Sequence, residues 1–398
     1  MERVFITGLG TISSIGINVK ESFDSLTSMR SGIGEINLLD TNLKTTLPAG
    51  EIKLNNEELK NILKIKSNKI FSRSALLGLI AAQEALQSSV INCKENKIGF
   101  FNATSVGGMD RGEELYKNYI NNTQYDKNYA LVHDCGESTE TIANHLGIKD
   151  FLTTISTACS SSANAIMQAA KMIKAGMLDC AVAGGSDGLT LFTINGFNSL
   201  MILSDEKCKP FDQERKGLNL GEGAGYIVLE SEKNISKSNR KPLAELTGYG
   251  NACDAYHQTA SSENGQGAYL AMKKALLINN INPENIDYIN AHGTATVNND
   301  LSEGRAIERV FGNKIPPFSS TKAYTGHTLA ASGGIEAVYS VLAIQNNIVY
   351  PNLNFKNKIN DLSLSPETSL KHIPVLKNVL SNSFGFGGNN SSLIFSKC

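Results

Sequence analysis

One cysteine in the chain stands where a predicted strand passes directly into a predicted helix, a favourable position for a nucleophile. Cys159 follows the β-branched run at residues 152–155, which is typical of a buried strand. Apolar residues then recur at helical spacing as far as Gly176: Ala163, Ile166, Ala170 and Ile173. At a helix N-terminus the free N–H groups and the positive end of the dipole favour a thiolate, the nucleophilic form. The small neighbouring residues leave room for a carbonyl to reach backbone N–H donors, as acyl transfer requires; the alternative role is a buried structural cysteine.

Two of the six histidines lie in polar turns that follow predicted strands. His292 begins the sequence His-Gly-Thr-Ala-Thr after the strand expected at residues 286–290, and His327 stands at a strand–helix junction shortly after Lys322. Together with Cys159 they indicate one reactive site rather than isolated structural histidines. A zinc site is the competing interpretation, because histidine and cysteine both bind zinc. No carboxylate or second cysteine stands at ligand spacing beside either histidine, so we expect no metal.

The composition is that of a globular α/β protein and argues against several classes of partner. The 398 residues are 41% hydrophobic and 19% charged, with a net charge of −1, so nothing suggests binding of nucleic acid or of an acidic membrane surface. The seven cysteines are odd in number and include no CxxC pair, which argues against a disulfide framework. The chain shows no signal-peptide pattern and no apolar run of membrane-spanning length, and we therefore expect a cytoplasmic protein outside the membrane.

The second half of the chain repeats the pattern of the first. A strand ends in Gly-Leu-Gly at residues 8–10, and another ends in Gly-Tyr-Gly at residues 248–250. A helical pattern follows each of them, and then a strand that enters small residues. We therefore expect two similar α/β units packed together, at residues 1–240 and 241–398, with the polar stretch at residues 231–240 as the hinge between them.

This repeat predicts how the reactive residues come together. The helix after Cys159 corresponds to a helix expected from about Gly326, beside His327. Both helix N-termini would then face one cleft.

Two further segments raise the question of binding surfaces. Gly8-Leu9-Gly10 hints at a dinucleotide fingerprint, but Ser13 stands at the third glycine position and no acidic residue follows at the expected distance, so a tight turn is the favoured role. The region at residues 54–73 is locally basic, with Lys60, Lys64, Lys66, Lys69 and Arg73. This region is either an ordinary solvated helix surface or a docking face for an acidic partner.

Four motifs, in order along the chain, resemble those of the chain-elongating β-ketoacyl-[acyl carrier protein] synthases. They lie at residues 157–161 (Thr-Ala-Cys-Ser-Ser), 291–296 (Ala-His-Gly-Thr-Ala-Thr), 321–327 (Thr-Lys-Ala-Tyr-Thr-Gly-His) and 382–390 (Asn-Ser-Phe-Gly-Phe-Gly-Gly-Asn-Asn). The resemblance covers essentially the whole chain. It implies the α/β thiolase fold, in which duplicated βαβαβαββ halves form a five-layer αβαβα sandwich.

The resemblance also implies catalytic roles. Cys159 would be the nucleophile that takes an acyl chain from the phosphopantetheine of an acyl carrier protein. His292 and His327 would donate hydrogen bonds where the thioester oxygen of the malonyl substrate gains charge, and Lys322 would tune the electrostatics near the thiol. The backbone N–H groups of Cys159 and Phe386 would form the oxyanion hole. No cofactor is implied beyond the phosphopantetheine that carries the substrates.

Supporting roles follow from the same resemblance. Glu336 matches a family position that would pair with the buried lysine of the third motif, because a buried lysine without a partner is costly. Asp300 and Glu303 would anchor the loop after the first histidine rather than act as acids or bases. Thr294 and Thr296 would bind the amides of the pantetheine arm.

The resemblance further assigns residues to the acyl pocket and to docking of the carrier protein. Phe386, between flexible glycines, would be a gate, and Val106, Phe197 and Phe384 would line the acyl pocket. The basic face would dock the carrier protein through Lys64, Lys66 and Lys69. This sequence departs from the family pattern at Met201, where many relatives have an arginine that contacts the carrier protein, and in having Asn389-Asn390 where Thr-Asn is usual.

The function implied is decarboxylative condensation of acyl- and malonyl-[acyl carrier protein] in fatty acid elongation. The alternative is the same condensation in a polyketide or aryl-polyene-type pathway, with this chain as the active subunit of a heterodimer with a chain-length factor. Thiolase-type degradation would need a second cysteine near the C-terminal glycine loop, and initiating synthases use Cys-His-Asn; neither pattern matches this chain. A non-catalytic carrier-protein binder remains as a different class. By analogy, a homodimer through residues 151–156 is expected.

Overall fold

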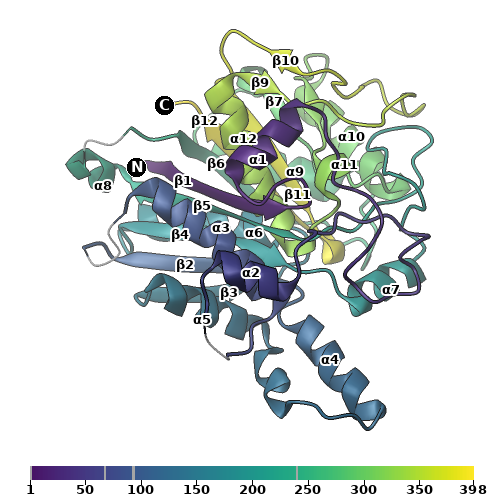
Figure 1. Ribbon diagram of the computed structural model, residues 1–398. Helices are drawn as coiled ribbons and strands as arrows, with labels where there is room; N and C mark the ends of the chain where they lie inside the picture. The colour runs from purple at the N-terminus through teal and green to yellow at the C-terminus, as the bar shows by residue number, and fades with distance from the viewer. Residues whose placement is uncertain (1, 67–68, 92–94, 239–240) are drawn as a thin grey trace.

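The strands form one mixed sheet whose two halves repeat the same order (Figure 1). The computed structural model describes residues 2–66, 69–91, 95–238 and 241–398. Within those residues ten strands lie in the order β3-β2-β4-β5-β1-β6-β12-β11-β7-β8, and β9 and β10 form a separate pair. The strand bounds are β1 Val4–Ser13, β2 Ile98–Ala103, β3 Phe151–Ile155, β4 Cys180–Asp187, β5 Gly223–Ser231, β6 Ala244–Cys253, β7 Tyr288–Asn290, β8 Phe318–Ser319, β9 Ile348–Val349, β10 Lys371–His372, β11 Asn378–Phe384 and β12 Asn389–Ser396.

The strands of each half have the same order when they are numbered along the chain within that half of the ten-stranded sheet. From the outer edge inwards, the order is third, second, fourth, fifth and first. In the first half β3, β2 and β4 are parallel, and β5 runs antiparallel to both β4 and β1. In the second half β8, β7 and β11 are parallel, and β12 runs antiparallel to both β11 and β6. The halves join where β1 pairs with β6 at Phe5–Glu245 and Ile6–Ala244. This repeated order is the duplicated α/β architecture that the sequence predicts.

The helices lie between the two halves of the sheet and on the outer face of each half, so the layers alternate helix, strand, helix, strand, helix (Figure 1). The central helices α6 and α12 each contact strands of both halves, while α3 and α5 cover the outer face of the first half, and α9, with α10 against it, covers the outer face of the second. The helix bounds are α1 Val19–Thr27, α2 Asn56–Ile62, α3 Arg73–Ser89, α4 Met109–Ile120, α5 Cys135–Leu146, α6 Ser161–Lys174, α7 Leu191–Ser199, α8 Glu232–Ser238, α9 Gln266–Leu277, α10 Val297–Phe311, α11 Lys322–Thr325 and α12 Ser332–Asn346, with the 3₁₀ turns η1 Lys127–Val132, η2 Pro283–Asn285, η3 Leu329–Ala331 and η4 Phe386–Gly388.

The two Gly-x-Gly segments have a packing role that the repeat explains. A Cβ atom on Gly8 or Gly10 would lie 2.1 or 1.9 Å from a main-chain oxygen of α3. A Cβ atom on Gly248 or Gly250 would lie 2.4 or 2.2 Å from a main-chain oxygen of α9. Only glycine permits such close approach of helix and strand in both halves. The resemblance of the first segment to a dinucleotide fingerprint is thereby explained without a nucleotide.

One predicted boundary is wrong: the helix expected from about Gly326 begins at Ser332. Gly326 and Leu329 have φ angles of 74° and 51°, in the left-handed region, which a continuous helix does not allow. The backbone of His327 instead bridges to Leu220, so the histidine is held in an extended turn before the helix. The predicted hinge, residues 231–240, contains helix α8, and its last two residues lie outside the described part of the chain. The domain boundary at residue 240 stays a prediction.

Within the described ranges, no helix has both the length and the apolar character needed to cross a lipid bilayer.

Candidate active site

Cys159 lies in a sharp turn between β3 and α6. The residue before it, Ala158, has a φ of 53°, a left-handed conformation that costs energy for any residue with a side chain. Ser160 is the N-cap of α6, so the cysteine directly precedes the helix N-terminus, as the sequence pattern predicts. The glycine-rich loop after β11 packs on this turn, because a Cβ atom on Gly385 would lie 3.2 Å from the backbone nitrogen of Cys159.

The thiol of Cys159 is buried and contacts a histidine from the other half of the chain. The Sγ atom lies 3.0 Å from Nε2 of His327, and the cysteine is 6% exposed. Burial raises the pKa of this thiol to about 11, although the charge of Lys322 and the backbone N–H groups of Phe386 and Cys159 act in the opposite direction. The backbone N–H groups at the helix N-terminus therefore favour the thiolate as expected, but their effect is smaller than that of burial.

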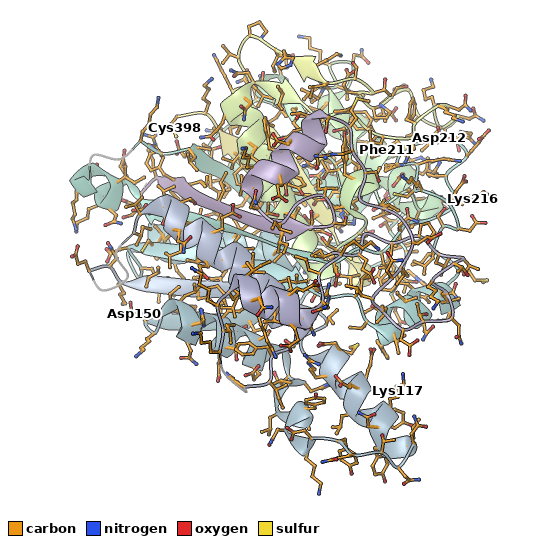
Figure 2. The ribbon with its side chains drawn as sticks, viewed as in Figure 1. Lys117, Asp150, Phe211, Asp212, Lys216 and Cys398 are labelled. Atoms are coloured by element: carbon orange, nitrogen blue, oxygen red, sulfur yellow. The ribbon has the colours of Figure 1, made fainter. Side chains whose placement is uncertain are left out.

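The rate of Cys159 alkylation is expected to rise with pH without reaching a plateau between about pH 7 and pH 10, because the reactive thiolate fraction keeps growing towards the raised pKa. The measurement is the pH dependence of iodoacetamide labelling, followed site by site with mass spectrometry. Cys398, an exposed cysteine, serves as the internal reference. In Figure 2 it lies on the opposite side of the molecule from Lys216, which lines the same cavity as Cys159. A plateau near neutral pH at Cys159 would contradict the expectation.

His327 is fixed at both ring nitrogens and through its backbone. Its Nδ1 atom lies 2.9 Å from the hydroxyl of Ser332, which itself lies 3.1 Å from the hydroxyl of Thr328. The backbone N–H of His327 donates to the carbonyl of Asn219 at 2.7 Å. A hydroxyl both donates and accepts, so Ser332 supports either neutral tautomer of the ring. Burial and the charge of Lys322 lower the pKa of His327 well below its usual value, so the ring is neutral.

His292 lies in the turn after β7 and faces the same cavity. Its ring centroid is 5.4 Å from that of His327 and 5.7 Å from that of Phe384. The carboxylate of Glu303 accepts hydrogen bonds from the backbone N–H groups of His292 (2.9 Å) and Gly293 (2.8 Å), which sets the direction of the turn. Burial, Lys322 and His327 together lower the pKa of His292 well below its usual value, so this ring is neutral as well.

A buried ion pair lies beside the two histidines. Lys322 and Glu336 form a salt bridge and are 2% and 3% exposed. Burial raises the pKa of Glu336 to about 7, and the lysine opposes this shift. Glu336 is on α12 and Lys322 on α11, so the pair ties the short segment before His327 to the helix after it. The lysine is the positive charge that favours neutral histidines and a lower thiol pKa.

Asp300 and Glu303 each hold a loop through backbone N–H groups. The carboxylate of Asp300 accepts from the N–H groups of Phe211 (2.6 Å) and Ala295 (3.1 Å), which joins the loop near Phe211 (labelled in Figure 2) to the turn after His292. Glu303 also accepts from the side chain of Asn382 at 3.1 Å. Neither carboxylate lines the cavity, in line with an anchoring role rather than an acid or base role.

A cavity of about 290 Å³ joins these residues to the surface. The reactive side chains that line it are Cys159, His292 and His327, and Thr294 and Thr296, whose hydroxyls are 2.9 Å apart, line it as well. Its apolar walls include Phe197, Phe384, Phe386, Leu218 and Ile202. At the outer end it is bordered by Leu200, Met201, Val297 and Lys216.

Phe386 lines this cavity and packs against a second aromatic residue of its wall. Its ring stacks on that of Phe197, with centroids 5.7 Å apart and planes at 15°. The next two residues, Gly387 and Gly388, both have a φ of 79°, which favours glycine and leaves this loop few side-chain restraints. Val106 does not line the cavity; it lies in the apolar cluster behind it, together with Leu218 and the partly buried Phe197.

The three lysines predicted to dock the carrier protein differ in the contacts that their side chains make in the structure. Lys64, Lys66 and Lys69 are all exposed, but the ammonium of Lys69 donates to Thr141 at 2.9 Å and pairs with Glu137 at 3.5 Å. Met201, at the cavity mouth, is 88% exposed.

Sequence reasoning missed the polar residues that hold these segments in place. Ser332 follows His327 by five residues and is the first residue of α12. Asn389 accepts hydrogen bonds from Ser160, Asn164 and Asn251 at 2.8, 2.9 and 2.8 Å, which ties the glycine-rich loop to α6. These contacts are between distant parts of the chain and have no local sequence signal.

Comparison with known proteins gives matches along the whole chain. Residues 1–234 match the model of the beta-ketoacyl synthase N-terminal domain, and residues 243–356 match that of the beta-ketoacyl synthase C-terminal domain. A protein of Staphylococcus aureus (strain COL) named 3-oxoacyl-[acyl-carrier-protein] synthase 2 is 33% identical over 415 residues, covering 100% of this chain and 98% of that protein.

Solved structures agree with these matches. The structure described as the ishigamide ketosynthase/chain length factor is similar with a TM-score of 0.93 at 29% identity, covering 100% of this chain and 99% of that chain. A type II PKS acyl-carrier protein in complex with its ketosynthase bound to the hexaketide is similar with a TM-score of 0.89 at 26% identity, and both chains are covered completely.

Proposed function

The chain belongs to the β-ketoacyl synthase family, and we infer that it condenses an acyl chain with a malonyl unit, both carried by acyl carrier protein. The products are 3-oxoacyl-[acyl carrier protein], carbon dioxide and free carrier protein. The observation that carries this assignment is the 3.0 Å contact between Sγ of Cys159 and Nε2 of His327, in a cavity that His292 also lines. A thiol nucleophile and two neutral imidazoles are the groups that acyl transfer and decarboxylation require.

In the first half-reaction Cys159 attacks the thioester of the acyl carrier protein. The new C–S bond forms at the cysteine, the bond to the carrier breaks, and the thiol proton passes to the departing carrier thiolate. His327 is placed to move this proton through Nε2, with Ser332 accepting from Nδ1. The backbone N–H groups of Cys159 and Phe386 are directed at the sulfur region and would stabilise the oxyanion.

In the second half-reaction the malonyl thioester loses carbon dioxide and its carbanion equivalent attacks the acyl-cysteine. A C–C bond forms, the C–S bond to Cys159 breaks, and the cysteine thiolate that leaves takes up a proton from solvent. Negative charge develops on the malonyl thioester oxygen, where neutral His292 and His327 donate from Nε2. For His327 this needs the tautomer in which Ser332 donates to Nδ1, and the hydroxyl of Thr328 can then donate to Ser332.

We propose fatty acid elongation as the pathway, since the relative from Staphylococcus aureus is named 3-oxoacyl-[acyl-carrier-protein] synthase 2. The second candidate is a polyketide or aryl-polyene-type pathway, favoured by the similarity to a ketosynthase/chain length factor. The test is condensation of malonyl carrier protein with a panel of saturated and polyunsaturated acyl carrier proteins. Extension of saturated chains supports the first pathway, and selective extension of polyunsaturated chains supports the second. No 3-oxoacyl product from any member would overturn the assignment.

The carrier protein is proposed to dock at the cavity mouth, steered by Lys64 and Lys66, which form no side-chain contact with another described residue that would restrain them as Lys69 is restrained. The double variant Lys64→Glu/Lys66→Glu is expected to raise KM for acyl carrier protein by about tenfold at low salt, with a smaller effect at high salt, because rim charges act on encounter and are screened. Lys233→Glu, on α8, is the matched control and should leave KM unchanged. Equal KM values for the double variant and the wild type would remove these lysines from the docking surface.

We also propose that two copies of this chain associate along β3. This strand forms the outer edge of its half-sheet, where no strand among the described residues pairs with its free side, and its Leu152 side chain is 36% exposed. Light scattering should give a dimer mass for the wild type and a monomer mass for Leu152→Asp, because the introduced charge would be buried in the interface. A wild-type monomer that assembles only with a chain-length-factor homologue would instead indicate a heterodimer.

The expectations that catalysis uses no metal or bound cofactor, that neither nucleic acid nor membrane is a partner, and that the enzyme is cytoplasmic stay predictions.

A further inference from the structure

A buried carboxylate at the end of β4 joins two parts of the active site that come from different halves of the chain. Asp187 is fully buried, at 0% exposure. Its Oδ1 atom accepts from the hydroxyl of Thr104 (2.5 Å) and from the N–H groups of Ser105 and Val106 (both 3.0 Å). Its Oδ2 atom accepts from the hydroxyl of Ser105 (2.7 Å) and from the N–H of Ala330 (2.8 Å).

These donors belong to two segments. Residues 104–106 form the loop after β2. The side chain of Val106, in this loop, packs in the apolar cluster behind the cavity. Ala330 lies in η3, the turn between His327 and α12. The two segments converge closely on β4, because a Cβ atom on Gly185 would lie 2.7 Å from the carbonyl oxygen of Ala103 and 3.2 Å from that of Ala330.

Every described hydrogen-bond donor to the carboxylate of Asp187 is an uncharged hydroxyl or backbone N–H group. Among the described residues no lysine, arginine or histidine forms an ion pair with Asp187. A buried charge without a counter-charge is costly, so it persists only where preorganised donors surround it. Hydrogen bonds to an ionised acceptor are roughly twice as strong as neutral ones, and the five donor groups around Asp187 make a rigid junction.

We propose that Asp187 is a positioning residue that aligns the acyl-pocket loop with the turn holding His327. This inference rests on the proposed condensation. Leu329 is held with a φ of 51° between His327 and Ala330, so the turn is strained and needs an external tether. The hydrogen bond from Ala330 to Asp187 supplies that tether and so keeps Nε2 of His327 at the thiol of Cys159.

The carboxylate of Asp187 also holds the loop after β2 and so sets the position of Val106. Three donors of the loop point at one oxygen, and Thr104 also accepts from the N–H of Gly107 at 2.9 Å, which closes the turn. The side chain of Val106 packs with Leu218 and Phe197, which line the cavity. A shift of this loop would alter the space available to the end of an acyl chain.

The test compares Asp187→Asn with Thr104→Val. An amide cannot accept on both sides, so its NH₂ group must face either the loop donors or Ala330. Asp187→Asn is expected to lower the rate of malonyl-carrier-protein decarboxylation roughly 10- to 100-fold, the scale of an about 1 Å misplacement of a catalytic group. It is also expected to broaden the preference among acyl chain lengths in transfer to Cys159. Thr104→Val keeps the shape and the Ala330 contact, and should change only the chain-length preference.

A third readout separates this role from a general loss of structure. The charge of Asp187 raises the pKa of Cys159, so Asp187→Asn should move the pH dependence of Cys159 alkylation to lower pH. Wild-type decarboxylation and chain preference in Asp187→Asn would overturn the proposal. So would parallel loss of all activities in both variants together with a lower unfolding temperature. If the wild-type enzyme itself releases no carbon dioxide, the proposed function fails, and the chain preference in acyl transfer and the alkylation curve still decide the role of Asp187.

Discussion

Cys159→Ala is expected to abolish formation of the acyl-enzyme and to reduce condensation by roughly 10⁴- to 10⁶-fold, the range seen when a nucleophile is removed from a covalent mechanism. The physical reason is that no other described cysteine lines the active-site cavity. The measurement is intact-protein mass spectrometry after incubation with acyl carrier protein, combined with the rate of 3-oxoacyl product formation. Decarboxylation of malonyl carrier protein should survive in part, because both histidines remain.

The matched control for this variant is Cys398→Ser, which removes an exposed thiol remote from the cavity. It should retain one acyl group per chain and full activity. An acyl adduct that persists in Cys159→Ala would place the nucleophile elsewhere. Absence of an adduct in the wild type with every acyl chain would instead favour a non-catalytic carrier-protein binder, the remaining class suggested by the sequence.

The parts of the site that the sequence predicts well are those with a repeated local pattern. The strand–small residue–helix pattern recurs around Cys159 and His327, so the repeat alone places two helix N-termini at one cleft. The structure brings the two side chains to 3.0 Å. The exact start of α12 was not predictable in this way. Its displacement to Ser332 depends on the backbone contact between His327 and Asn219, which are far apart in the sequence.

The pKa shifts and the contacts between distant side chains were the least predictable features of the site, because they depend on which groups are buried together. The helix N-terminus favours a thiolate at Cys159, yet complete desolvation outweighs it and raises the thiol pKa. In the sequence Lys69 belongs to a basic face that looks free, yet in the structure it is held by Glu137 and Thr141 of α5. Asp187 stands in the unremarkable sequence Gly-Gly-Ser-Asp, and nothing local indicates that donors from two distant segments of the chain converge on it.

His292→Ala is expected to separate the two half-reactions. Decarboxylation of malonyl carrier protein should fall by about 10²- to 10³-fold, as for the loss of one preorganised donor to a developing oxyanion. Transfer of the acyl chain to Cys159 should change much less, because the thiol contacts His327 and not His292. The measurements are release of carbon dioxide from malonyl carrier protein and the rate of acyl-adduct formation by mass spectrometry.

The conservative variant His292→Asn tests whether donation, rather than filling of space, is the role of this ring. Its amide N–H can donate to the thioester oxygen, so decarboxylation should recover in part, whereas His292→Leu, which fills the space without a donor, should resemble the alanine variant. The turn itself should persist in all three, because Glu303 holds it through backbone N–H groups. Since burial keeps His292 neutral, wild-type decarboxylation should also show no titration near pH 6.5, the usual pKa of histidine. Equal loss of both half-reactions in His292→Ala, without rescue by asparagine, would contradict the assignment.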